Sequence, residues 1–172
     1  AFLGAFNDGS NTGVQFLLEP GPNARLYLRA EGNQTRSLTT SAGSINAEEW
    51  SHIAATYDGP NLRLFVNGVQ VASSTGSTLS NFEPWQYPMV LLARNVMGNI
   101  DAQHSGQVDD LRIYNYAKSQ EEIGQLYFDV SGERVCLYRP TFDFTGDCKV
   151  GIDDFVLFAS EWLENGLYPL EP

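Results

Sequence analysis

The most chemically specific segment of the chain is a run of oxygen-bearing side chains at alternate positions in residues 143–154. Its oxygen donors stand at positions 1, 3, 5 and 12 of the run: Asp143, Thr145, Asp147 and Asp154. A hard cation such as Ca²⁺ takes about six to eight oxygen ligands, and this spacing turns alternate side chains toward one centre. The backbone carbonyl of Lys149, at position 7, completes the expected ring. The spacing therefore predicts a calcium loop with these five ligands; the alternative is an acidic surface turn.

A short amphipathic helix is expected directly after this loop. Phe155, Phe158, Ala159 and Trp162 recur at helical spacing, so one face of that helix is apolar and must pack on something. Trp162 is then either part of that packing or directed at a partner.

The two cysteines, Cys136 and Cys148, lie on either side of the entry to the loop. We expect a disulfide between them, which implies an oxidising, extracytoplasmic compartment. The chain-entropy model assigns about 2 to 3 kcal/mol to a closed loop this short. Zinc would need more Cys or His ligands than this region supplies.

Charge narrows the classes of partner. The 172 residues include 10 basic and 21 acidic side chains, a net charge of −11, which disfavours binding to nucleic acid or to anionic lipid. No apolar run approaches the roughly twenty residues that a membrane span needs. We therefore expect a secreted or cell-surface protein with neither a nucleic-acid partner nor a membrane span.

Most of the chain reads as short strands separated by turns. Apolar and polar residues alternate through residues 14–18, 25–30, 52–57, 62–66, 69–72, 90–93 and 108–114, which predicts strands. Asp58-Gly59 and Asn67-Gly68 mark turns, and Asn67-Gly68 is typical of a type I′ hairpin. These features predict a mainly β, antiparallel sandwich or barrel.

One helix interrupts the strands. Ser119 and Glu122 form a capping box, and Ile123, Leu126 and Tyr127 make a buried stripe. The polar stretch after it predicts two domains, residues 1–130 and residues 131–172, the second being a linker and a small calcium-loop and helix module.

The second part resembles one calcium repeat of a type I dockerin. Cys148 at position 6 and Asp154 at position 12 depart from the usual EF-hand pattern. They match the dockerin variant with a cysteine inside the loop that ends many secreted planctomycete proteins. The resemblance implies a cohesin-like protein, or other domains of a parent protein, as a partner. Such dockerins normally carry two repeats and this chain shows one, so the repeat alternatively acts as a calcium-stabilised cap.

The first part resembles a laminin-G-like jelly roll of the concanavalin A-like lectin and glucanase superfamily. Three stretches carry the resemblance: residues 49–59 around Trp50, His52 and Tyr57, residues 62–71, and residues 106–119. It implies an antiparallel jelly-roll β-sandwich in which Trp50 and His52 pack. Family members usually begin with two or three further strands, so we expect a fragment, a proteolytic product, or a sheet completed by another chain.

Asp109 is a second, weaker candidate calcium ligand. On the expected strand 108–114 it shares a face with Leu111 and Ile113, and a carboxylate on an apolar face must be paired or bound to metal. In related lectin-like sandwiches an acid at this place helps hold a structural calcium. A salt bridge or hydrogen bonds to turn amides is the alternative.

A loop between two expected strands has the composition of a sugar site. Its aromatic and amide side chains are Phe82, Trp85, Gln86 and Tyr87; the alternative is that they cover a sheet end. The alternating acids that glycan hydrolases of this superfamily use on one strand are absent. We therefore expect a non-catalytic extracellular module that binds carbohydrate or a cell surface. The alternatives are an assembly protein that docks through the dockerin-like part, or an accessory domain of a larger secreted enzyme.

Overall fold

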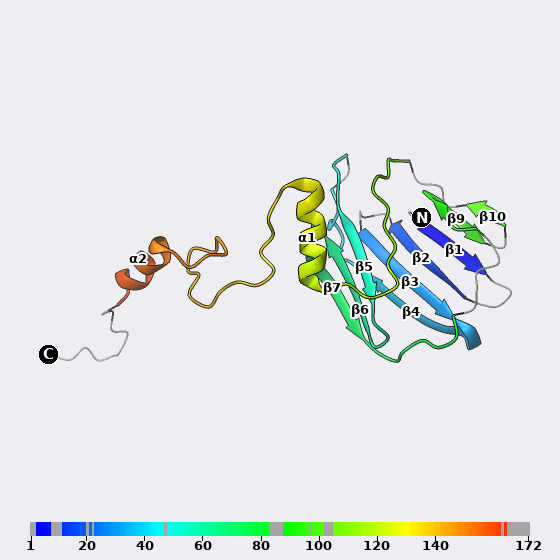
Figure 1. Ribbon diagram of the computed structural model, residues 1–172, viewed down its shortest axis with the longest axis horizontal. Coiled ribbons are helices and arrows are strands. Elements are labelled where there is room, and N and C mark those ends of the chain that lie inside the picture. The colour runs from blue at the N-terminus through cyan, green and yellow to red at the C-terminus, as the bar shows by residue number, and fades with distance from the viewer. Residues whose placement is uncertain are drawn as a thin grey trace. The chain divides into compact units, whose positions relative to one another are not determined.

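Short strands of the first part pair into two sheets (Figure 1). The computed structural model describes residues 3–7, 12–19, 21, 23–46, 48–82, 88–96, 98–101, 105–162 and 164. The larger sheet has the order β10-β9-β1-β2-β3-β4, with β8 paired to β1, and the smaller sheet has the order β5-β6-β7. The strands are β1 (Leu3–Asn7), β2 (Thr12–Glu19), β3 (Asn23–Ala30), β4 (Gln34–Thr39), β5 (Ile53–Tyr57), β6 (Asn61–Val66), β7 (Val69–Thr75), β8 (Val90–Leu91), β9 (Arg94–Val96) and β10 (Asn99–Asp101). Apart from a parallel bridge between β1 and β9, the pairs are antiparallel, which confirms the predicted sandwich.

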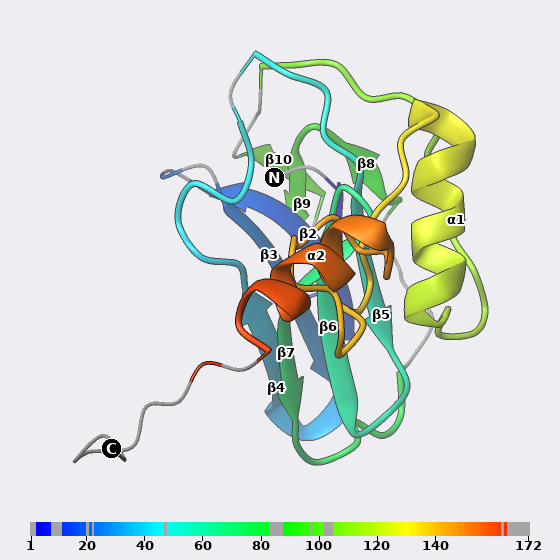
Figure 2. The same cartoon turned by 90° about the vertical axis from the view of Figure 1, so that its left-hand side faces the viewer.

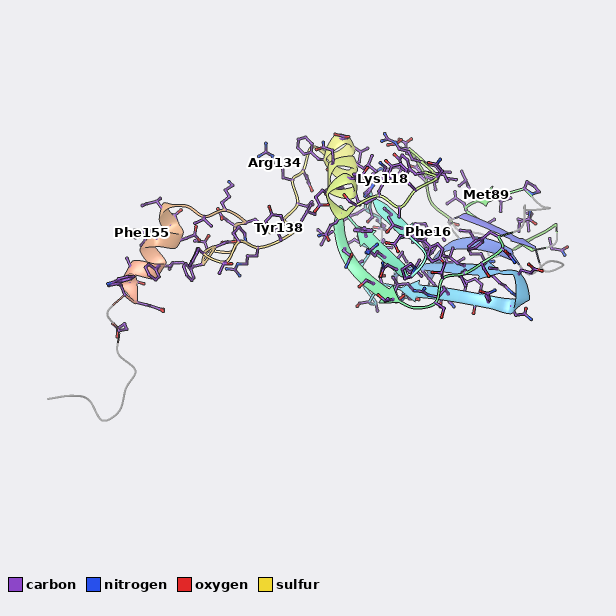
Figure 3. The ribbon with its side chains drawn as sticks, turned by 60° about the horizontal axis from the view of Figure 1, so that its bottom comes forward. Phe16, Met89, Lys118, Arg134, Tyr138 and Phe155 are labelled. Carbon is purple, nitrogen blue, oxygen red and sulfur yellow. A yellow bond between two sulfur atoms is a disulfide. The ribbon has the colours of Figure 1, made fainter. Side chains whose placement is uncertain are left out.

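Alternation along the strands builds the core between the sheets. Every second residue of β3 is buried, because successive side chains of a strand point to opposite faces. On β6, Leu62 and Leu64 are fully buried and meet the residues of β3 in one apolar cluster. Phe16 of β2 belongs to the same cluster and lies between the sheets in Figure 3.

The predicted turns and helix have the expected geometry. Asn67 and Gly68 have φ values of 48° and 76°, as the type I′ hairpin between β6 and β7 requires. Helix α1 (Gln120–Ser131) begins at Ser119, whose hydroxyl accepts the amide of Glu122 while the Glu122 carboxylate accepts the amide of Ser119. The helix buries Ile123 and Tyr127. It lies beside the small sheet, as Figures 1 and 2 show.

Replacement of Gly68 by alanine should destabilise the first unit more than the same change at Gly43. Both glycines have nearly the same positive φ, 76° and 77°, so both variants carry a similar backbone strain of about 1 kcal/mol or more. A Cβ at Gly68 would lie 3.0 Å from the Cβ of Tyr127, whereas nothing lies within 4 Å of one at Gly43. Urea unfolding of both variants measures the difference, and equal losses would contradict the helix contact.

Residues 108–114 do not form the predicted strand. Asp110 has a φ of 51°, which breaks the extended conformation, and its carboxylate pairs with Arg112 at 2.8 Å. Leu111 and Ile113 are exposed, so the expectation that Asp109 faces a buried apolar surface is wrong. Trp50, expected to pack in the core, is also exposed, at 68%. Both corrections concern the side of the sandwich next to β5.

The opposite side of the sandwich is closed. Arg36 on β4 donates to the carbonyls of Pro60 (3.1 Å), Ser74 (3.2 Å) and Ser77 (3.0 Å). It thereby ties the larger sheet to the β5–β6 turn and to the end of β7. Each such charge-assisted bond stabilises more than a neutral one.

The chain divides into two compact units, Ala1–Val135 and Cys136–Pro172. The division falls a few residues beyond the expected boundary at residue 130, because α1 continues through Ser131 and ends at the left-handed Gly132. The second unit contains α2 (Ile152–Ser160). Among the described residues, no helix is long and apolar enough to cross a membrane.

Candidate functional site

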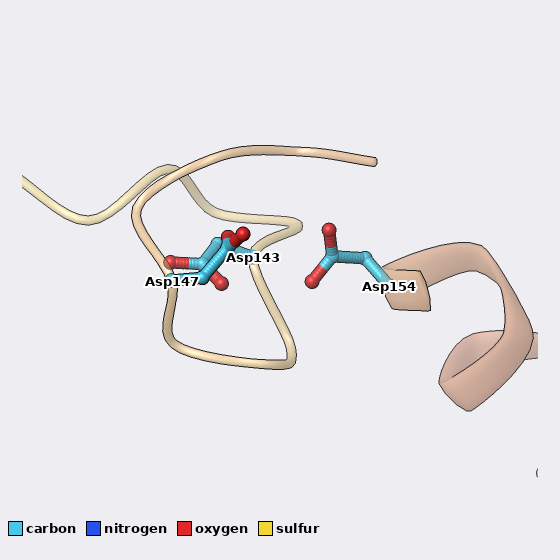
Figure 4. Close-up of side chains that lie close together, drawn as sticks. All are labelled: Asp143, Asp147 and Asp154. Carbon is cyan, nitrogen blue, oxygen red and sulfur yellow. The ribbon is translucent and has the colours of Figure 1, made fainter. Parts of the chain in front are cut away.

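Three carboxylates of the predicted loop lie together in the second unit (Figure 4). One oxygen from each of Asp143, Asp147 and Asp154 lies within 4.8 Å of the others. The hydroxyl of Thr145 joins the cluster, at 3.3 Å from Asp143 Oδ1 and 3.0 Å from Asp154 Oδ1. The structure thus brings together the four side chains that the sequence singled out.

Backbone amides hold the two buried carboxylates in place. Asp143, 3% exposed, accepts the amides of Gly146 (2.6 Å) and Cys148 (2.9 Å). Asp154, also 3% exposed, accepts the amides of Thr145 (2.9 Å) and Gly151 (2.6 Å). Backbone hydrogen bonds thus hold the acidic oxygens close together, and the donor set consists of the hard oxygens that Ca²⁺ prefers.

The remaining two predicted ligands are less clearly placed. Lys149, expected to offer its carbonyl, donates its amide to Asp147 Oδ1 at 2.9 Å. Asp109 belongs to the first unit, where it is exposed and accepts the amide of Asp110 at 2.8 Å. Sequence reasoning missed Arg139, whose Nε lies 3.4 Å from Asp143 Oδ2. Its side chain is 57% exposed and also donates to the backbone carbonyl of Asp143.

Acid should destabilise the metal-free second unit between about pH 4 and pH 2. Hydrogen bonds from the amides of Thr145 and Gly151 lower the pKa of Asp154 from 3.8 to about 2. This contribution to stability is complete above pH 3.8 and is lost as the pH falls toward 2, because the unfolded chain binds the proton more readily. Amide NMR of α2 in EDTA measures the loss. Asp154→Asn should remove this part of the pH dependence, and equal acid sensitivity of both proteins would contradict the assignment.

The predicted disulfide links Cys136 to Cys148. It closes a short loop around the entry to the carboxylate cluster, and Cys148 itself donates its amide to Asp143. The covalent link and the carboxylate network therefore constrain the same few residues.

The predicted sugar loop is only partly within the described residues. Trp85, Gln86 and Tyr87 lie outside them. Phe82 is described: it is 42% exposed and its ring meets Tyr57 edge to face at 6.3 Å. Tyr57 in turn accepts the amide of Leu79 at 2.7 Å, which anchors the start of the loop on β5.

Polar side chains lie around the segment that contains Phe82, and the sequence analysis did not predict them. The side-chain amide of Asn81 donates to Glu31 Oε2 at 3.1 Å, and the backbone carbonyl of Asn81 accepts the Glu31 amide at 3.3 Å. Gln34 donates to Ser80 Oγ at 3.2 Å and to the carbonyl of Glu31 at 3.0 Å. Glu31 belongs to η1 (Glu31–Asn33), about fifty positions away in sequence, so only the fold reveals this neighbourhood. We call Glu31, Gln34, Ser80, Asn81 and Phe82 the Phe82 patch.

The adjacent acid pairs of the sequence have structural partners where the structure describes them. Asp110 pairs with Arg112. Glu122 closes the capping box of α1 and pairs with Lys118 at 3.1 Å. A salt bridge thus explains the carboxylate of Asp110, and helix capping together with an ion pair explains that of Glu122.

Comparison with known proteins places the fold. Pappalysin-1 of Mus musculus is 29% identical over 103 residues and that of Homo sapiens 30% identical over 107 residues, each match covering 58% of this chain. The chain spans about 6% of the length of these two relatives. They are therefore informative about one domain and not about a whole protein.

Solved structures share the sandwich at low identity. The Ruminococcus gnavus IT-sialidase CBM40 superposes with a TM-score of 0.62 at 16% identity, covering 72% of this chain and 71% of that one. A leech intramolecular trans-sialidase gives a TM-score of 0.62 at 18% identity, covering 86% of this chain and 22% of that one. Identities this low show the fold alone. The model of the concanavalin A-like lectin/glucanases superfamily matches residues 1–124, and the chain belongs to this superfamily.

Proposed function

We propose that the first unit is a non-catalytic, extracellular glycan-binding module and that the Phe82 patch is its binding surface. The observation that carries the proposal is an exposed aromatic ring beside a ready set of planar polar groups. Phe82 offers an apolar face, while Asn81, Gln34 and Glu31 are exposed and hydrogen-bonded to one another. Sugar rings stack their C–H faces on aromatics and direct hydroxyls at such groups.

The charge of the patch favours a neutral glycan. Glu31 contributes a carboxylate at the centre of the polar group, and the whole chain carries −11. This negative potential would repel a sialylated or sulfated sugar, whereas it would not repel a neutral oligosaccharide. One of the similar solved structures is the CBM40 bound to alpha2,3 sialyllactose, an acidic glycan. Binding of acidic glycans should therefore be compared with binding of neutral glycans.

Phe82→Ala should abolish retention on immobilised neutral glycans. Affinity electrophoresis of the wild type against a panel of neutral polysaccharides identifies the ligand, and sialyllactose, added as the acidic competitor, should not displace it. Phe128→Ala is the matched control, because Phe128 is another exposed phenylalanine of the first unit, 38% exposed against 42% for Phe82. Retention that survives Phe82→Ala, or that is lost equally in Phe128→Ala, would contradict the proposed surface.

The second unit is proposed to bind Ca²⁺ through Asp143, Thr145, Asp147 and Asp154, with the Lys149 carbonyl as a further ligand. The cluster of three carboxylates and one hydroxyl supports this assignment, and the disulfide fits an oxidising, extracellular setting. The ion would neutralise acids that lie close together and would link the loop to the first turn of α2. We assign it a structural role.

A second function, docking to a protein partner, is supported by α2. Its side chains Phe155, Val156 and Leu157 are 60%, 58% and 47% exposed, and Phe155 is labelled on the helix in Figure 3. Only part of the expected apolar face is packed within the unit: Phe158 stacks on Phe144 and meets Trp162. A cohesin-like protein is the proposed partner. Pull-down with a calcium-loaded chain, compared with Phe155→Ser, tests this docking separately from glycan binding.

A further inference from the structure

A large groove runs along the open side of the sandwich. Its volume is about 2220 Å³, well above the roughly 300 to 1,000 Å³ of pockets that hold small molecules. Its apolar residues include Val14, Phe16 and Leu18 of β2 and Ile53 and Ala55 of β5.

One wall of the groove is an unpaired strand edge. Strand β5 pairs with β6 alone among the described strands. Asn67 donates to the carbonyl of His52 at 2.8 Å, which starts the ladder at position 52. Hydrogen-bonded pairs alternate in an antiparallel ladder. The amides and carbonyls of Ile53, Ala55 and Tyr57 therefore point away from β6.

A second part of the groove lining is a segment without a backbone ladder. Residues 105–118 have no helix or strand and line the groove together with β5. Their apolar side chains Leu111 and Ile113 are 43% and 66% exposed. Trp50, 68% exposed, also lines the groove. Apolar surface and unpaired backbone groups thus occur together. A polypeptide strand can bury apolar side chains on the first and form main-chain hydrogen bonds with the second, and a sugar matches this combination less well.

The rim of the groove is acidic. Glu48, Glu49 and Asp109 line it, and the two further charges beside them, Asp110 and Arg112, neutralise each other in a salt bridge. Lys118, also lining the groove, is engaged by Glu122. The charge left over is negative, so basic side chains on the outward face of an occupant are favoured.

We infer that the groove binds an extended segment of another polypeptide, with alternating apolar and basic residues, that adds to β5 as a strand. Its backbone pairs with Ile53, Ala55 and Tyr57. Its apolar side chains face Val14 and Phe16 while its basic side chains meet the acidic rim. The residues of the Phe82 patch do not line this groove; the two sites meet at Tyr57, whose backbone belongs to the groove and whose ring contacts Phe82.

The probe is a synthetic heptapeptide of alternating lysine and valine with blocked ends, added to the full chain. Calorimetry should show saturable binding of one peptide. Amide hydrogen exchange at Ile53, Ala55 and Tyr57 should slow several-fold, while the amides of Ala54 and Thr56 change little because they face β6. Two control peptides separate the contributions: lysine alternating with serine keeps the charge, and N-methylation at alternate residues removes the backbone donors. Both should bind at least tenfold more weakly.

Variants of the chain complete the test. Glu48→Lys with Glu49→Lys reverses the charge of two exposed rim residues and should weaken peptide binding at least tenfold without unfolding the protein. Phe82→Ala should leave peptide binding unchanged, so failure of this site and failure of the glycan site remain distinguishable. The inference would be overturned if the lysine–serine peptide bound as tightly as the lysine–valine peptide, or if exchange slowed over the whole chain. Either result would show that the interaction is nonspecific charge attraction.

Discussion

Calcium is expected to raise the stability of the second unit of the wild-type chain, and Asp143→Ala or Asp154→Ala is expected to abolish that rise. Both carboxylates are almost fully buried in the cluster, so each variant removes a ligand that nothing else replaces. A ligand present at about 100 times its Kd stabilises the folded state by about 2.7 kcal/mol. The measurement is hydrogen exchange of the α2 amides in Ca²⁺ and in EDTA.

Asp153→Ala is the matched control for this experiment. Asp153 stands next to Asp154 in the first turn of α2 but is exposed and outside the carboxylate cluster. Its variant loses the same formal charge and should keep the calcium response. If EDTA leaves exchange in the wild type unchanged, or if Asp153→Ala loses the response as completely as Asp154→Ala, then the proposed ligand set is wrong.

Loss of the disulfide should have the second large effect. Replacing both Cys136 and Cys148 by serine opens the loop of sequence separation 12, for which the chain-entropy model gives about 3 kcal/mol. The second unit has little apolar core to offset this: among its described residues only Asp143 and Asp154 are buried. In EDTA, the double variant should therefore lose the slow exchange of α2.

Calcium should partly restore α2 in this double-serine variant, with a weaker apparent affinity than in the wild type. The reason is that metal binding is coupled to folding, so the ion must then also supply the ordering that the disulfide provides. Asp154→Ala in the same background should show no restoration. Equal calcium affinity with and without the disulfide would contradict a shared constraint on residues 136–154.

Local patterns predicted much of the fold. The Asn67-Gly68 turn, the Ser119 capping box and the alternation of β3 each depend on a few neighbouring residues, and all three are confirmed. On β6 the alternation holds up to Leu64, after which Phe65 and Val66 are both buried. Strand β4 was missed because its side chains alternate between exposed and half-buried positions, so its sequence lacks an apolar stripe. It is held by its ladder with β3.

The errors arose where structure depends on distant partners. Residues 108–114 alternate like a strand, but alternation supplies no pairing edge, and Asp110 adopts a left-handed conformation stabilised by Arg112 instead. Trp50 was expected to pack because of the family resemblance, yet its position on the groove leaves it exposed. The candidate sites differ in the same way: the clustered carboxylates Asp143, Asp147 and Asp154 lie within twelve residues of sequence, whereas Glu31 and Asn81 meet only through the fold.

Glycan binding by the sandwich at the Phe82 patch can be mapped by NMR, with a neutral oligosaccharide titrated into the isotopically labelled chain. Residues 80–82 and the neighbouring Glu31 and Gln34 should show saturable shifts, and Phe82→Ala should remove them. Shifts confined to Trp50 and the groove would contradict glycan binding at the Phe82 patch. The absence of a saturable shift with every neutral glycan tested would contradict it too.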